Sequence, residues 1–194
     1  MPMRVKILFF LVMFINFCMF AQTSLGLRAE PFYDLAKIEK RIDYPIPTTT
    51  IENSSNGNFA LSLALSFNVS ERIAISVRPG FVFGGIYSGF DGGLLITYDV
   101  FRNCYILGGV NTHLNFGGGG NTLSSDGVTI PYAITGLGFD ISRNGSIEVQ
   151  FNYSLNQVSY GSERHMQSSP PYTTMSYYRI PWLIKVSFGL EWEL

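Results

Sequence analysis

The sequence predicts an all-β chain: an eight-stranded antiparallel up-and-down transmembrane β-barrel, preceded by a cleaved signal peptide. Apolar and small polar side chains alternate with period two along several segments, and short and long connections between those segments alternate. Only 14% of the 194 residues are charged, against about 25% in an ordinary soluble domain. The formal charge of −1 also argues against a nucleic-acid-binding protein, which normally carries a basic patch.

The first 21 residues have the pattern of a secretory signal peptide. Arg4 and Lys6 precede an apolar run over 7–20, and Ala21 supplies a small residue before the polar Gln22. The apolar run is shorter than the roughly 20 residues that a membrane-spanning helix needs. We therefore expect a signal peptide over 1–21 and a single barrel domain over 22–194.

Export is compatible with the cysteine content. Cleavage after residue 21 would remove Cys18 and leave Cys104 as the one cysteine, so no intramolecular disulfide is expected. A small secreted scaffold held together by disulfides is therefore disfavoured, whereas a periplasmic or outer-membrane location is compatible.

The first four predicted strands cover 23–33, 59–69, 73–83 and 93–101. Each has an apolar face, formed in turn by Leu25, Leu27 and Ala29; by Phe59, Leu61, Leu63, Leu65, Phe67 and Val69; by Ile73, Ile75, Val77, Phe81 and Phe83; and by Leu94, Ile96, Tyr98 and Val100. The residues between them are mostly Ala, Ser, Gly and Asn, with isolated charges. Strict alternation of this kind indicates strands that have one apolar and one polar side.

The remaining four predicted strands cover 104–116, 130–141, 146–156 and a last segment after 176 that is clearest from 184 to 194. Their apolar faces are Ile106, Val110, Leu114 and Phe116; Leu137, Phe139 and Ile141; Ile147, Val149, Phe151, Tyr153 and Leu155; and Ile184, Val186, Phe188, Leu190, Trp192 and Leu194. Pro131 blurs the phase of 130–141 at its start.

The connections fall into two classes. Three are tight turns, at Ser70-Glu71-Arg72, Arg102-Asn103 and Ser142-Arg143-Asn144-Gly145, and Asn-Gly is a strong hairpin signal. The others, 34–57, 84–92, 117–129 and 157–176, are long and rich in Asn, Ser, Gly, Thr and Pro. We expect all tight turns, with both termini, at a periplasmic end and long loops at the outer end.

The polar face separates two environments for such a sheet. A soluble β-sandwich, the alternative, would bury its apolar side and normally expose Lys, Glu, Arg and Thr. Small polar residues instead suit the narrow lumen of an eight-stranded barrel. An even strand number and short periplasmic turns opposite longer outer loops are typical of outer-membrane barrels.

Several segments resemble the PorT-like outer-membrane β-barrel family, also described as porin-family proteins, and more loosely the small OmpX- and OmpA-type barrels. The resemblance lies in Ser24–Ala29, Phe81–Gly85, Gly136–Asp140 and Ile147–Tyr153. The C-terminal Phe188–Leu194 is similar to the barrel-assembly signal of these proteins, although it ends in Leu194 rather than an aromatic residue. The resemblance implies a bacterial outer-membrane barrel and specifies no activity.

Charged residues on the predicted lumen face are the first candidate site. They are Arg28, Glu30, Arg78, Glu148 and Lys185, with Asp99, Asp140 and Glu191 nearer the turn end. A selective pore or a ligand path is one interpretation, and a packed network of ion pairs is the other. The packed network is favoured, because an unpaired buried charge costs several kcal/mol. Closure of the first strand against the last would bring Glu30 towards Lys185.

Aromatic residues near strand ends are the second candidate group. Tyr98, Phe101, Tyr105, Tyr153, Trp182 and Trp192 are expected to form the girdles at the two membrane interfaces rather than a sugar-binding surface. The two histidines, His113 on the lumen face and His165 in the last long loop, are interpreted as polar lumen and loop residues without catalytic function. No Cys/His cluster has metal-ligand spacing, and no cofactor is expected.

Three functional hypotheses follow. The favoured one is a structural or surface-interaction barrel whose outer loops, especially 34–57 and 157–176, contact lipopolysaccharide or an extracellular ligand. The alternatives are a narrow pore for small solutes and, with less support, a lipid-modifying enzyme. Expected partners are outer-membrane lipid, lipopolysaccharide and the barrel-assembly machinery, with no nucleic acid.

Overall fold

The computed structural model describes residues 23–42, 47–84, 87–116, 122–123, 128–156, 159, 161–168 and 171–194. The expected signal peptide, 1–21, lies outside these residues. The strands are β1 (Thr23–Ile42), β2 (Thr48–Asn68), β3 (Ile73–Phe83), β4 (Gly89–Phe101), β5 (Cys104–Asn115), β6 (Thr122–Leu123), β7 (Val128–Asp140), β8 (Gly145–Ser154), β9 (Gly161–Ser168) and β10 (Pro171–Glu193). No helix among the described residues is long and apolar enough to cross a membrane.

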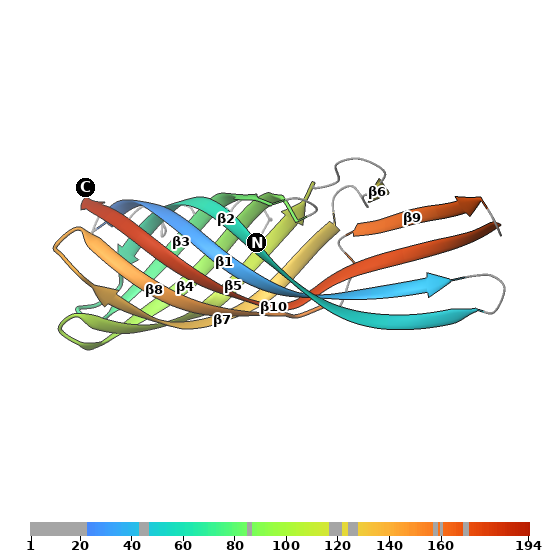
Figure 1. The fold of residues 1–194 in the computed structure, drawn as a ribbon. Helices are drawn as coiled ribbons and strands as arrows, with labels where there is room; N and C mark the ends of the chain where they lie inside the picture. The colour runs from blue at the N-terminus through green and yellow to red at the C-terminus, as the bar shows by residue number, and fades with distance from the viewer. Residues whose placement is uncertain are drawn as a thin grey trace, which may run out of the picture.

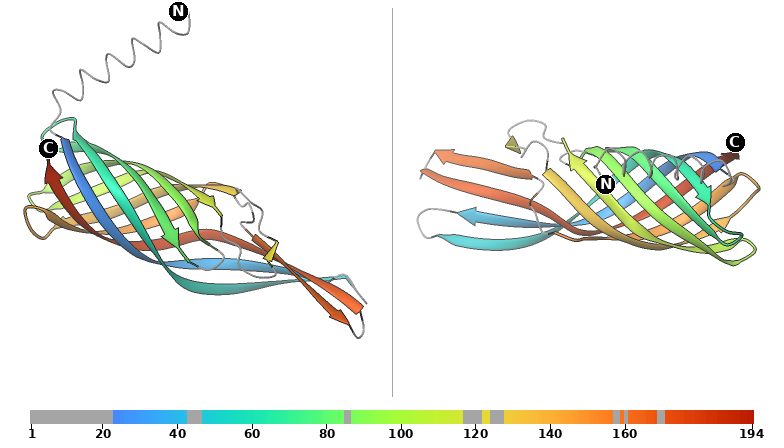
Figure 2. Two further views of the ribbon diagram at one scale, coloured as in Figure 1. Left: turned by 90° about the horizontal axis from the view of Figure 1, so that it is seen from above. Right: turned by 180° about the vertical axis from the view of Figure 1, so that it is seen from behind.

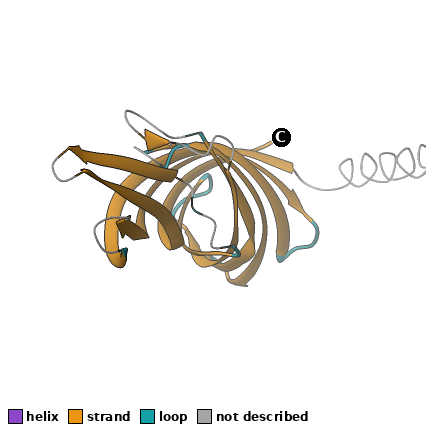
Figure 3. Cartoon of the chain, turned by 90° about the vertical axis from the view of Figure 1, so that its right-hand side faces the viewer, coloured by secondary structure: helices purple, strands orange, loops and turns teal. Residues whose placement is uncertain are grey.

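Eight of these strands close into a barrel. Neighbours along β1-β2-β3-β4-β5-β7-β8-β10 pair in sequence order and antiparallel, and β10 pairs back onto β1 to complete the ring. Figure 3 shows the barrel approximately along its axis, and Figure 1 shows it from the side. The closed eight-stranded antiparallel barrel that the sequence predicts is therefore confirmed, and the β-sandwich alternative is excluded.

The apolar residues of the alternating pattern lie on the outer face of the barrel, and the polar residues lie on the inner face. Large apolar side chains such as Leu27, Leu63, Leu94 and Val149 point outward and are exposed. Ser, Asn, Gln and charged residues of the same strands point inward and are buried. An apolar exterior around a polar interior is the arrangement of a transmembrane barrel, because lipid solvates the exterior while the backbone hydrogen bonds are satisfied by closure.

The prediction of long loops over 34–57 and 157–176 is wrong, because strands occupy most of both segments. β1 continues to Ile42 and β2 begins at Thr48, so 34–57 is largely a β-hairpin; likewise β9 and the start of β10 occupy most of 157–176. The hairpins are joined side by side, because β1 and β10 stay paired as far as Ile42 and Thr174. They form a sheet of order β2-β1-β10-β9 that projects beyond one end of the barrel (Figures 1 and 2). We call this sheet the extension.

A bulge marks the point where the barrel wall passes into the extension. Leu35 pairs with Trp182 and Lys37 with Arg179, so that two residues of β10, Ile180 and Pro181, lie opposite the single Ala36. A proline is tolerated at a bulge because the ladder is already interrupted there. At β9 the extension gains a short further strand, since β6 pairs with Ser162 and Glu163.

Candidate functional site

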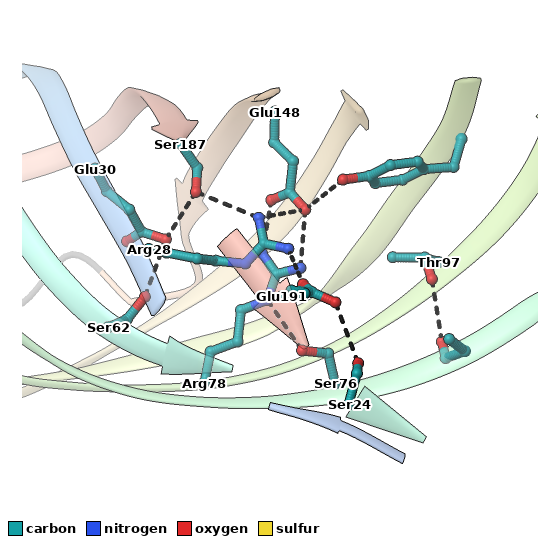
Figure 4. Close-up of polar contacts among 12 residues, drawn as sticks. Ser24, Arg28, Glu30, Ser62, Ser76, Arg78, Thr97, Glu148, Ser187 and Glu191 are labelled. Carbon is teal, nitrogen blue, oxygen red and sulfur yellow. Dashed lines mark hydrogen bonds and ion pairs between the residues drawn. The ribbon is translucent and has the colours of Figure 1, made fainter. Parts of the chain in front are cut away.

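The first charged layer of the lumen is centred on Glu148. This residue points inward from β8, is fully buried, and pairs with the guanidinium groups of the buried Arg28 and Arg78 (Figure 4). Arg28 Nη1 lies 2.8 Å from Glu148 Oε1, and Arg78 makes a two-pronged pair through Nη1 to Oε2 at 2.6 Å and Nη2 to Oε1 at 2.9 Å. A bidentate guanidinium–carboxylate pair fixes geometry as well as charge.

Neutral donors and a second carboxylate complete this layer. The Tyr105 hydroxyl donates to Glu148 Oε1 at 2.9 Å, and Gln150 Nε2 donates to Oε2 at 2.7 Å. Arg28 also pairs with Glu191, whose side chain is 29% exposed. One buried carboxylate therefore binds two arginines, and the second carboxylate balances the excess positive charge from the turn end.

The placement of Tyr105 corrects one sequence prediction. The sequence predicts Tyr105 in a membrane-interface girdle, but its side chain lies in the lumen and is 7% exposed. Ile106 occupies the outward position next to it, at 46% exposure. Because successive side chains of a strand point to opposite faces, an outward Ile106 requires an inward Tyr105. The apolar–polar alternation along 104–116 is therefore the sequence signal that indicates a lumen position for Tyr105.

The second charged layer is centred on Asp91 and lies farther along the lumen. Lys185 Nζ donates to Asp91 Oδ2 at 2.7 Å and lies 3.7 Å from Glu30 Oε2, so the expected approach of Glu30 to Lys185 occurs in the structure. Asn111 donates to Asp91 Oδ2 at 3.1 Å, and His113 Nδ1 lies 2.6 Å from Asp91 Oδ1. The sequence predicts a loop over 84–92, which includes Asp91, whereas Asp91 is part of β4.

An apolar layer covers the second charged layer on the side of the extension. It consists of Phe32, Ala36, Ala60, Val82, Tyr87, Ile130, Tyr132, Ile180 and Leu183, all buried. The Tyr87 ring stacks on His113 at 4.0 Å between centroids, and its hydroxyl lies 3.2 Å from that of Tyr132. We call this layer the cap. Sequence reasoning missed it, because apolar side chains inside a barrel contradict the rule that apolar residues face the lipid.

The opposite end of the lumen is an open polar vestibule of about 570 Å³. Arg28, Arg78 and Glu148 line it on the inside, and turn residues such as Ser70 and Asn144 line its mouth. Asp99, Asp140 and Glu191, which the sequence placed near the turn end, also line it. The vestibule therefore reaches as far as the first charged layer.

The other predicted aromatic residues lie on or near the outer surface. Tyr98, Phe101, Tyr153 and Trp192 are 40%, 73%, 51% and 50% exposed. Trp182 is half-buried and its ring packs against that of Phe151, with centroids 5.8 Å apart. Phe101 and Trp192 lie towards the turn end of their strands, and Tyr153 and Trp182 lie towards the extension.

His113 has no catalytic partners of a recognisable kind among the residues that the structure describes. His113 is fully buried, and its Nε2 lies 3.3 Å from Asn115 Oδ1 while Nδ1 faces Asp91. Within the part of the chain that the structure describes, no serine hydroxyl is bonded to His113, and no group of His, Cys, Asp and Glu could hold a metal ion. His165 lies in β9, whose side chains are outside the description.

The comparisons with known proteins identify the fold. No family model matches the sequence, and no curated protein sequence matches it. The crystal structure of the outer membrane protein OprG from Pseudomonas aeruginosa superposes with a TM-score of 0.50 at 11% identity, covering 90% of this chain and 97% of that one. AlkL (TM-score 0.42, 15% identity, 87% and 91% covered) and the Neisserial surface protein NspA (0.42, 9%, 86% and 96%) are more distant.

Proposed function

We propose that this chain is a small bacterial outer-membrane β-barrel with a closed lumen and a structural or surface-interaction role carried by the extension. The observation that supports this proposal most directly is the filling of the lumen. Two layers of buried ion pairs, around Glu148 and Asp91, and the apolar cap follow one another from the vestibule to the extension. A narrow pore for small solutes is the second candidate, and the vestibule is the feature that favours it.

The filled lumen favours the structural role over the pore. An ion that crossed the barrel would have to separate Glu148 from Arg28 and Arg78, then Asp91 from Lys185, and then enter the cap. Breaking a buried ion pair by removing a partner costs about 3–5 kcal/mol, and an apolar constriction resists wetting. These successive barriers are the physical basis for a closed barrel.

The proposed orientation puts the turn end in the periplasm and the extension outside the cell. Both ends of the described barrel meet at the turn end, where the Leu194 amide donates to the Thr23 carbonyl at 2.9 Å. This is the usual orientation of such barrels, with short turns in the periplasm. Assembly by the barrel-assembly machinery and membership of the PorT-like family are part of the same proposal, supported by the sequence resemblance.

The proposal includes no enzymatic activity. The Asp91–His113 pair lies inside the lumen beneath Tyr87 of the cap, and His113 is fully buried. A lipid substrate outside the barrel would therefore have no direct route to the imidazole. If the lipid-modifying alternative held, His113→Ala would abolish a change in lipid acylation that the wild-type protein produces.

Planar-bilayer recording tests the closed lumen. We expect no single-channel steps from the refolded protein, and the same silence from Arg28→Lys as a charge-conserving control. Steps in the wild-type protein that change in size in Arg78→Ala would contradict the closed lumen and establish the pore.

Cysteine labelling on intact cells tests the orientation. Thr50→Cys places a thiol on the exposed β1–β2 hairpin of the extension, whereas the native Cys104 lies next to a tight turn at the other end. A membrane-impermeant maleimide should label Thr50→Cys on intact cells and reach Cys104 only after the outer membrane is opened. The reverse order of labelling would overturn the orientation.

A further inference from the structure

The outward face of the extension carries basic side chains immediately beyond the lipid-facing surface. Lys37 is opposite Arg179 in the β1–β10 ladder, Glu39 is opposite Tyr177, and Arg41 follows in the same alternation. Two residues earlier on β1, Leu35 is opposite Trp182. Because alternate residues of a strand share a face, these charges continue the outward face of the barrel wall beyond its aromatic residues.

The described side chains of this face have an excess of positive charge. Glu39 accepts from both neighbouring arginines, with 2.7 Å to Arg41 and 3.3 Å to Arg179. Lys37 is exposed and has no ion-pair partner among the described residues. This face therefore carries three basic side chains, Lys37, Arg41 and Arg179, and one carboxylate, that of Glu39. On the other face of the extension Lys40 and Glu52 form a closed pair at 2.7 Å, so the excess lies on the outward side.

The two basic side chains nearest the barrel line a small cavity. It has a volume of about 70 Å³ and is lined by Lys37, Glu39, Ile51, Asn156, Arg179, Ile180 and Pro181. The Nε of Arg179 has no hydrogen-bond partner among the described residues. A cavity needs at least about 10–15 Å³ of such volume to hold one water molecule, so this one has room for a small polar group. Lys37 and Arg179 supply the positive charge that an anionic group would need.

We propose that Lys37 and Arg179 bind the phosphate of an anionic lipid in the leaflet next to the extension. This inference deepens the proposed function, on whose orientation it rests, by naming the partner and the residues. A planar guanidinium and a lysine ammonium are suited to phosphate oxygens. The site lies just beyond Trp182, and aromatic residues mark the interface where headgroups begin. A lipid with its chains against the outer wall would therefore bring its phosphate to this height.

Native mass spectrometry of the refolded full-length barrel in detergent tests the site. The probe is lipid A with two phosphates, and the comparison lipid is the same molecule after dephosphorylation. We expect the phosphorylated lipid to bind more tightly, and the double variant Lys37→Ala/Arg179→Ala to lose about 30-fold in affinity for it, since each basic group near a membrane surface contributes roughly fivefold. Glu39→Gln removes the competing carboxylate and should tighten binding.

The matched control removes the same charge elsewhere. Lys40→Ala/Arg143→Ala deletes one lysine and one arginine, from the other face of the extension and from the turn end, where Arg143 is 86% exposed. This variant should bind the phosphorylated lipid as the wild type does. Equal losses in the two double variants, or equal binding of the two lipids by the wild type, would overturn the inference.

The proposed function fails in a different way. A protein that stays soluble without detergent and shows no heat-modifiable gel mobility would contradict the membrane barrel itself. A barrel that inserts and is heat-modifiable, but binds both lipids equally, would contradict the phosphate site alone.

Discussion

Replacement of Glu148 by glutamine is the sharpest test of how the lumen is held together. The amide keeps the size and shape of the carboxylate, so neighbouring side chains need not move to accommodate it. It removes the negative charge that faces Arg28 and Arg78, and it replaces one acceptor oxygen by a donor NH₂ group. At least one guanidinium N–H would then face another donor.

The magnitude follows from the contacts. Glu148 is fully buried and makes three guanidinium contacts of 2.6 to 2.9 Å. Arg28 keeps Glu191 as a charged partner in the variant, whereas Arg78 keeps no carboxylate among the described residues, only neutral acceptors such as the Ser76 hydroxyl at 3.0 Å. Removing one member of a buried pair costs about 3–5 kcal/mol because the other charge stays buried. We expect Glu148→Gln to lower the free energy of unfolding by about that amount.

Urea unfolding in lipid vesicles measures this change. The two tryptophans, Trp182 and Trp192, report on both ends of the wall by fluorescence, and gel mobility reports on barrel closure. Glu52→Gln is the matched control, because it breaks an exposed pair with Lys40 and should cost at most about 1 kcal/mol. A cost below about 1 kcal/mol for Glu148→Gln would refute the claim that this carboxylate organises the lumen.

Three further substitutions test the wall and the first layer by the same unfolding assay. Tyr105→Phe removes a hydrogen bond to a buried carboxylate and should cost about 1.5–3 kcal/mol; no loss would mean that the hydroxyl is dispensable. Gly138→Ala would put a Cβ 2.1 Å from the Tyr105 ring, and overpacking of this kind typically costs about 1–3 kcal/mol; the loss should shrink in a Tyr105→Ala background. Leu94→Arg puts a charge on the exposed apolar wall and should cost about 2–4 kcal/mol, whereas Thr50→Arg on the extension should be nearly neutral.

The barrel strands could be predicted from sequence wherever lipid contacts one of their faces. The strand over 73–83 has the predicted bounds, and 104–116 and 130–141 differ from β5 and β7 by one or two residues at their ends. The apolar alternation arises from the lipid, so it ends where the lipid ends. In the extension both faces meet water, as the exposed Thr48–Ile51 shows, and only the β-branched composition of that run indicated a strand.

The site could be predicted only in part, for a related reason. Alternation put Arg28, Arg78, Glu148 and Lys185 on the inner face, but it carries no information on which charges meet across the lumen. That depends on the stagger of the closed ring, which brings Arg78 of β3 to Glu148 of β8. The cap residues Phe32 and Tyr132 follow the inward phase of their strands, but their apolar character is the opposite of what the lumen face otherwise carries, so the polar pattern does not mark them as a buried layer.

The continuity of β1 and β10 through the bulge ties the extension to the order of assembly. The first and last barrel strands are far apart in the sequence. They stay paired from Ser24 and Glu193 at the turn end to Ile42 and Thr174 in the extension, with one bulge between Leu35 and Lys37. Each of the two hairpins can form from local sequence, but their junction cannot form until the ring has closed. The joined four-stranded sheet, and with it the juxtaposition of Lys37 and Arg179, is thus a surface marker of a completed barrel, absent from any assembly intermediate whose first and last strands are still apart.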